Sequence, residues 1–114
     1  MPEPATLKPV VFRGDSLDRL RQFPQSARRE SGFQIDRVQR GLKPNDCKPM
    51  KIIGPGCNEI RVRDAAGAFR VLYVARLANA VYVLHCFQKK AEKTAKTDIK
   101  LARTRYRELM RGVK

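Results

Sequence analysis

Several residue types are scarce in this chain, and each shortage excludes a class of protein. There is one histidine, and the three cysteines, Cys47, Cys57 and Cys86, form no Cys-x-x-Cys pair. We therefore expect neither a metal site nor a disulfide framework, and we predict no cofactor. No apolar run is long enough to cross a membrane, and residues 1–6 lack the apolar core of a signal peptide. These absences predict a cytoplasmic protein with no membrane partner.

Acidic residues are the other shortage. Lys and Arg number 25 against 11 Asp and Glu, which leaves a net charge of +14. Self-repulsion of this size opposes compaction, so we expect an acidic partner such as RNA, DNA, a ribosome, an acidic protein or an anionic membrane surface. Half of the excess follows residue 88, where ten basic residues stand against three acidic ones. This imbalance favours a nucleic-acid-binding surface over an ordinary solvated helix face.

The first half of the chain predicts one strand followed by two helices. Residues 9–12 are apolar and predict a short strand, placed at an edge of the sheet. Asp15 is positioned to cap a brief helix. Pro24 suits the first turn of a second helix, whose apolar stripe runs over residues 27–42 and for which Gly41 offers a stop. Because the proline also bends the chain between them, the two helices are expected to form a hairpin.

The second half predicts an antiparallel sheet and a final helix. Residues 43–50 predict a loop, and Gly67 supplies the turn of a hairpin. Strands are expected at residues 50–53, 58–63, 69–75 and 81–87. The last of these is apolar on both faces, so it should be an inner strand. A helix over residues 97–110, capped by Thr97, carries an apolar face beside a basic stripe and should pack on the sheet.

Taken together, these elements predict an α+β fold in one domain over residues 1–114. It has an antiparallel sheet of three to five strands, an N-terminal helical hairpin and a C-terminal helix packed on the sheet. Residues 1–8 and 112–114 are expected to be flexible tails.

The order of the predicted elements, together with several sequence segments, resembles that of the RelE/ParE toxin superfamily. Its phage-derived, HigB-like branch carries an ELR-type strand, an R-x-x-Y strand, an LHxFxKK segment, a lysine–threonine pair and a helix. The matching residues are Glu59-Ile-Arg61-Val-Arg63, Phe69-Arg70-Val-Leu-Tyr73, Leu84-His85-Cys-Phe87-Gln-Lys89-Lys90, Lys93-Thr94, Ala102 and Arg105. Ile60 replaces the leucine of the first motif.

The resemblance implies a RelE-like fold and a toxin of a type II toxin–antitoxin system. Relatives of this kind cleave messenger RNA, usually in the ribosomal decoding site. The implied partners are therefore mRNA, the ribosome and a co-encoded helix-turn-helix antitoxin of HigA type. Two alternatives stay open, because fold alone does not fix activity: a ParE-like gyrase poison, and a phage protein that binds nucleic acid without cleaving it.

Metal-free RNA cleavage needs a base near the 2′-hydroxyl, cations around the phosphorane and an acid for the leaving 5′-oxygen. By the resemblance, Arg61 and Arg70 match cationic positions of the family's active surface. Arg70 is the predicted phosphate ligand, because a guanidinium binds two phosphate oxygens at once. Lys89 or Lys90 is expected to contact the phosphate or act as the acid. His85 is the only conventional base, and it faces either the core or the substrate.

Other side chains are predicted to contact the nucleic acid around the scissile bond. Arg63 shares a strand face with Arg61, and Tyr73 and Phe87 could stack on bases, with core packing as the alternative. The remaining contacts are predicted at Lys93, Lys96, Lys100 and Arg103. For each basic residue the alternative is a solvated charge. Glu59 is expected to tether an arginine, with general-base work as its alternative.

Overall fold

The structure is a computed structural model that describes residues 7–112. Within that range the elements are β1 (Val10–Phe12), α1 (Ser16–Arg21), α2 (Gln25–Gln39), β2 (Cys47–Pro49), β3 (Cys57–Asp64), β4 (Gly67–Val74), β5 (Val81–Lys89) and α3 (Lys96–Gly112). Most of the two predicted tails lies outside the described residues. Lys8, in the first of them, is tied to the fold, since its backbone N–H donates to the Gln39 carbonyl.

The strands form one mixed sheet in the order β1-β5-β4-β3-β2. Strands β2 to β5 are antiparallel, which confirms the predicted meander, and residues 9–12 do lie at an edge. The prediction of a wholly antiparallel sheet needs one correction, because β1 runs parallel to β5. The chain crosses from β1 to the opposite edge through α1 and α2 before the meander begins, so β1 meets the last strand instead of the next one.

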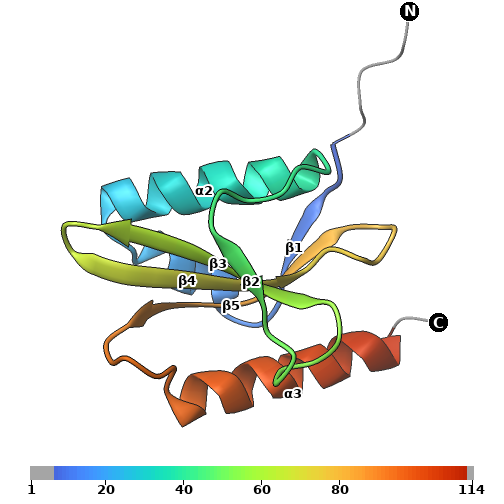
Figure 1. The fold of residues 1–114 in the computed structure, drawn as a ribbon. Helices are drawn as coiled ribbons and strands as arrows, with labels where there is room; N and C mark the ends of the chain where they lie inside the picture. Colours follow the sequence, from blue (N-terminus) through green and yellow to red (C-terminus); the bar gives the residue numbers. More distant parts are fainter. Residues whose placement is uncertain (1–6, 113–114) are drawn as a thin grey trace, which may run out of the picture.

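Helices cover both faces of the sheet (Figure 1). Leu20, Ala27 and Ile35 from α1 and α2 pack on one face, and Ala102 and Tyr106 from α3 pack on the other. An inner strand between two such layers must be apolar on both sides. Strand β5 fits this description, which confirms the prediction that residues 81–87 form an inner strand.

The second helix follows its predicted stripe up to the stop at Gly41. The buried positions of α2 are Ala27, Ser31, Gln34, Ile35 and Val38. Gly41 has a φ of +79°, a conformation that favours glycine after a helix end. Leu42 lies beyond this stop and is 50% exposed, so the stripe ends earlier than predicted. Helices α1 and α2 contact the sheet more than each other, and the predicted helical hairpin is not confirmed.

Residues 50–53 form a turn, so the strand predicted there is wrong. Met50 and Ile53 are apolar because they pack in the layer under α3, and the short run imitates a strand. The edge strand β2 lies just before this turn, within the predicted loop 43–50, and pairs with β3. A three-residue strand with one partner leaves too short a pattern in the sequence to be recognised.

Asp15 occupies the predicted N-cap position of α1 but makes no side-chain capping hydrogen bond, because its carboxylate has other partners. It accepts hydrogen bonds from Arg19, at 3.0 Å, and from Arg105 on α3, at 2.6 Å. Arg105 also donates to the Leu84 carbonyl of β5 at 2.9 Å. The residue that was expected to begin a helix therefore joins the two helical layers around the edge of the sheet.

The last helix is amphipathic and slightly longer than predicted. Ala102, Tyr106 and Leu109 are buried against the sheet, whereas Lys100 and Arg103 are exposed. The prediction of a core face beside a basic stripe is thus confirmed. Neither α3 nor another helix within residues 7–112 combines the length and the apolar character that crossing a membrane would require.

Candidate active site

Cations from neighbouring strands line one concavity on the α3 side of the sheet. Arg61 of β3 stands directly opposite Arg70 of β4 in the antiparallel register, and Lys89 ends the adjacent strand β5. The concavity has a volume of about 490 Å³. Its lining residues are Asp46, Arg61, Val62, Arg63, Ala68, Arg70, Lys89, Lys90, Ala91 and Glu92. We call Arg61, Arg63, Arg70, Lys89 and Lys90 the cationic cluster.

The concavity exists because α3 covers only part of this face. Leu72 and Val74 of β4 pack in the layer under α3. Arg70, two residues before Leu72 on the same strand, points to the same face of the sheet but lies beyond that layer. The chain leaves β5 at Lys89 and resumes as α3 at Lys96 (Figure 1). The intervening loop, residues 90–95, contributes Lys90 and Glu92 to the rim of the concavity.

Glu59 lies beneath the two arginines. Its side chain is 2% exposed, and its Oε1 is 3.4 Å from Nε of Arg61 and 3.5 Å from Nε of Arg70. This placement confirms the prediction that Glu59 tethers an arginine, and it tethers two. One buried carboxylate beside two guanidiniums leaves a positive excess, which a phosphate could neutralise.

The contacts between these groups are electrostatic and leave hydrogen bonds unmade. Nε of Arg61, Nε of Arg70 and Oε2 of Glu59 have no hydrogen-bond partner within the described part of the chain. Buried charged atoms without hydrogen bonds are expensive, and each such group in a native structure calls for an explanation. Two of these three atoms belong to arginines that line the concavity, so the unmade hydrogen bonds lie at or next to it.

Arg70 is the most constrained member of the cationic cluster. Its side chain is only 8% exposed, and its Nη1 donates to the Phe69 carbonyl at 3.0 Å. Burial lowers the pKa of the Arg70 guanidinium, and the Glu59 carboxylate acts in the opposite direction. Because an arginine starts far above neutral pH, the group stays charged. Arg70 is therefore a fixed charge, while Arg61, with 35% of its side chain exposed, is more accessible to solvent.

His85 does not line the concavity. It is fully buried, its Nε2 lies 2.7 Å from Oδ1 of Asp98, and its ring stacks on Phe87 with centroids 5.2 Å apart. Burial lowers the pKa of His85, and the hydrogen bond with Asp98 acts against this shift. Of the two positions predicted for this histidine, the core position describes where it lies.

The two predicted stacking residues are also in the core. Tyr73 packs in the layer under α1 and α2, and Phe87 packs in the layer under α3. Burial raises the pKa of Tyr73, as expected of a phenol removed from water. Only small fractions of the two rings are exposed, 4% for Tyr73 and 5% for Phe87. The alternative of core packing describes both.

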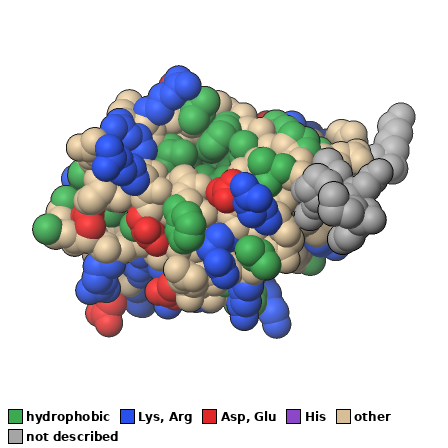
Figure 2. All heavy atoms as spheres, turned by 90° about the horizontal axis from the view of Figure 1, so that it is seen from above, with side chains coloured by type: hydrophobic (Ala, Val, Ile, Leu, Met, Phe, Trp, Pro, Cys, Tyr) green, Lys and Arg blue, Asp and Glu red, His purple; other side chains and the backbone are tan. Residues whose placement is uncertain are grey.

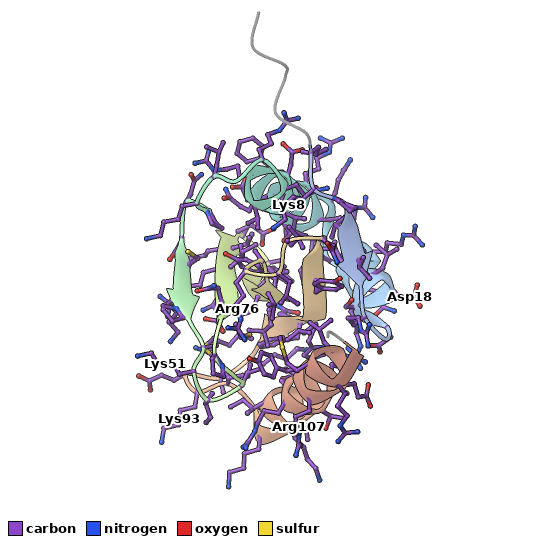
Figure 3. The ribbon with its side chains drawn as sticks, turned by 90° about the vertical axis from the view of Figure 1, so that its right-hand side faces the viewer. Lys8, Asp18, Lys51, Arg76, Lys93 and Arg107 are labelled. Carbon is purple, nitrogen blue, oxygen red and sulfur yellow. The ribbon has the colours of Figure 1, made fainter. Side chains whose placement is uncertain are left out.

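The other predicted nucleic-acid contacts lie outside the concavity. Lys93 lines a small cavity beneath the loop with Phe87, Lys89 and Asp98. A separate groove of about 480 Å³, which we call the α3 groove, runs along α3. It is lined by Ile52, Lys96, Ile99, Lys100, Arg103 and Arg107. Lys93 and Arg107 both lie on the α3 side of the molecule in Figure 3. The opposite, α2 face has its Lys and Arg dispersed around hydrophobic patches (Figure 2).

Two carboxylates in the concavity were missed by sequence reasoning. Asp46 lies just before β2, and its carbonyl accepts the backbone N–H of Arg61 at 2.9 Å. Glu92 lies in the loop after β5. Neither belongs to a periodic pattern, so no signal in the sequence places them beside the arginines. Within residues 7–112 no three His, Cys, Asp or Glu side chains gather closely enough to hold a metal ion.

The fold agrees with the family comparison. The sequence profile of the family described as phage derived protein Gp49-like (DUF891) matches residues 18–107. The chain therefore belongs to this family, which is part of the RelE/ParE-like toxin superfamily of toxin–antitoxin systems. The α+β architecture, with its five-stranded mixed sheet and C-terminal helix, is compatible with a RelE-like fold. A search of curated proteins found no match.

Proposed function

We propose that this protein is a HigB-like toxin that cleaves messenger RNA without a metal, acts on the ribosome and arrests translation in the cytoplasm. The observation that carries the proposal is the concavity itself. Arg61, Arg70, Lys89 and Lys90 come from two strands, a strand end and a loop, and they line one hollow of the size that a nucleotide needs. Four cations facing one space repel each other, so an anionic ligand offsets their proximity.

The proposed reaction is an in-line displacement at phosphorus. The 2′-oxygen attacks, the bond from phosphorus to the 5′-oxygen breaks, and a 2′,3′-cyclic phosphate and a 5′-hydroxyl result. Arg70 and Arg61 donate to the non-bridging oxygens, whose charge grows in the transition state. Their positions on paired strands fix this geometry before the RNA arrives.

We assign the proton transfers to residues at the rim of the concavity. Lys89 or Lys90 gives a proton to the leaving 5′-oxygen, since both line the concavity and carry donors. The 2′-hydroxyl proton goes to Asp46 or Glu92, the two carboxylates of the same hollow. His85 is not given this role, because within residues 7–112 its one side-chain hydrogen bond is with Asp98 and it has no exposed surface.

The cognate partner is a helix-turn-helix antitoxin that covers the concavity or the adjoining groove. The net charge of +14 makes an electrostatic contribution to that contact expected. Affinity should then fall as salt rises, because exposed charge pairs are screened. Titration of the two purified proteins at low and high salt measures this, and equal affinities would contradict it.

One observation favours a second candidate function, nucleic-acid binding without cleavage. The concavity lacks a histidine, and its two carboxylates lie on loops rather than on strands. A polyanion-binding surface needs only the cations. A gyrase poison would use the same surface on a protein target.

A reconstituted translation reaction tests these functions against each other. Wild-type protein is added to translating ribosomes, and primer extension maps the ends of the message with and without ribosomes. Discrete cuts that Arg70→Ala abolishes and Arg28→Ala, an exposed substitution on α2, leaves intact support the endonuclease. Intact message together with blocked gyrase supercoiling supports the poison. Intact message that the protein still binds supports nucleic-acid binding without cleavage.

A further inference from the structure

The buried contact between His85 and Asp98 joins β5 to the first turn of α3. The two side chains lie 2.7 Å apart, on either side of the loop 90–95. The imidazole is fully buried, and the side chain of Asp98 is 23% exposed. Nδ1 of His85 has no hydrogen-bond partner within residues 7–112. A buried polar contact with one nitrogen left unsatisfied is a poor source of stability, since apolar side chains of similar volume would pack there without the desolvation cost.

The loop between the two residues has little else to hold it. Within the residues that the structure describes, no side-chain hydrogen bond or ion pair joins residues 90–95 to the rest of the protein. A cavity of about 250 Å³ lies beneath the loop, lined by Lys89, Lys90, Lys93 and Asp98 among others. The loop is thus fixed mainly at its two ends, by β5 and by the first turn of α3.

We propose that His85 and Asp98 are a positioning pair that sets the loop 90–95, and with it Lys90 and Glu92, at the rim of the concavity. The inference rests on the proposed function, since the rim matters only if RNA is processed there. The pair touches no substrate. It fixes the start of α3 against β5, and the loop that spans these two points carries Lys90 and Glu92, two of the four proton-transfer candidates.

A second contact of α3 provides a matched control. Asp15, just before α1, accepts a 2.6 Å hydrogen bond from Arg105, which lies ten residues beyond the end of the loop at residue 95. Neither Asp15 nor Arg105 lines the concavity. If α3 needs only to be anchored somewhere, loss of either contact should have the same effect. If the loop must be positioned, only the contact between His85 and Asp98 should matter for cleavage.

The test compares Asp98→Ala, the conservative Asp98→Asn and the control Asp15→Ala. Amide hydrogen exchange over residues 90–95 and steady-state cleavage of message on translating ribosomes are measured with the full chain. Asp98→Ala should speed exchange of the loop and lower kcat by about tenfold with KM within about twofold, because a misplaced catalytic group affects the chemical step. Asp98→Asn keeps an acceptor for the imidazole and should restore most of kcat. Asp15→Ala should leave kcat and loop exchange unchanged.

The two arms separate failure of this inference from failure of the proposed function. Wild-type protein that cuts no RNA would overturn the proposed function, and the exchange arm would still decide whether the pair orders the loop. Unchanged exchange in Asp98→Ala would overturn the inference. So would an equal loss of kcat in Asp15→Ala. Should Asp98→Ala fail to fold, His85→Gln removes the same contact from the strand side and is judged by the same readouts.

Discussion

The concavity and the α3 groove carry similar numbers of cations but hold them differently. In the concavity, Arg61 and Arg70 stand on paired strands and share the buried Glu59. The α3 groove presents Lys96, Lys100, Arg103 and Arg107 from one helix, and none of them forms an ion pair within residues 7–112. Its floor is apolar, with Ile52 58% exposed.

This difference separates two uses of positive charge. A guanidinium fixed by a buried partner keeps its position when a substrate binds, so its effect on a transition state is pre-organised. A solvated lysine on a helix attracts a polyanion at long range but pays side-chain entropy to hold any one phosphate. We therefore expect the concavity to determine the rate of cleavage and the α3 groove to determine affinity for long RNA.

The largest effect should come from Arg70. Arg70→Ala removes the most buried cation of the cluster, and we expect cleavage to fall by roughly 10²–10³-fold, as when an oxyanion donor is lost. Arg70→Lys should recover little, because an ammonium does not bind two oxygens in parallel. Single-turnover cleavage of a defined RNA measures the loss, with thermal unfolding to verify the fold. Retention of near wild-type rate by Arg70→Ala would remove this residue from the site.

Glu59 should have the next largest effect. In Glu59→Gln two nearby guanidiniums lose their common counter-charge at a position that is almost fully buried. Breaking a buried ion pair by removing one partner costs about 3 kcal/mol of unfolding free energy. Denaturant unfolding measures this, and cleavage should fall along with it as the arginines lose their fixed positions. A variant as stable and as active as wild type would show that the carboxylate organises nothing.

A smaller effect should follow from the α3 groove. The triple variant Lys96→Gln, Lys100→Gln, Arg103→Gln should leave kcat for message on ribosomes unchanged and weaken binding of long free RNA. Three lost phosphate contacts should reduce the slope of log affinity against log salt by about 2. The matched control neutralises three exposed arginines on the other side of the molecule, Arg21, Arg28 and Arg29. Equal slopes for the two triple variants would show that only net charge matters.

The smallest effect should be that of pH on stability. Burial lowers the pKa of His85 below its ordinary 6.5, against the pull of Asp98, and the charges of Arg105 and Arg19 add to the lowering. The unfolded chain then binds more protons near that pH, so the free energy of unfolding should fall as pH drops through 6.5. His85→Gln should flatten this window. The hydrogen bond from Arg105 lowers the pKa of Asp15 to about 2 from 3.8, so its contribution is lost only below about pH 4.

The sequence indicates a good part of the fold because long patterns repeat. The stripe of α2, the two-sided apolar β5 and the amphipathic α3 each extend over many residues, and tertiary packing agrees with them. The strand predicted at residues 50–53 was wrong because a run of four residues is too short to distinguish a strand from a turn. Such a run is apolar in either structure, and here its apolar residues are explained by packing under α3.

The candidate site was only partly accessible from the sequence. Arg61 and Arg70 could be paired because both stand in strands that a tight turn brings into register. Asp46 and Glu92 could not, because loop residues reach the concavity through tertiary structure alone. From the sequence, His85 could point to either face of the sheet, because a strand that is apolar on both sides has no alternation that distinguishes the two faces.

The central claim is that the cationic cluster, and not the α3 groove, holds the scissile phosphate. It is tested most directly by titrating ¹⁵N-labelled protein with an RNA trinucleotide whose 2′-hydroxyl at the cut site is replaced by hydrogen. The account predicts that the Nε–H resonances of Arg61 and Arg70 and the amides of Lys89 and Lys90 shift first. Shifts confined to Lys96, Lys100 and Arg103, with the arginine side chains of the sheet unmoved, would contradict it.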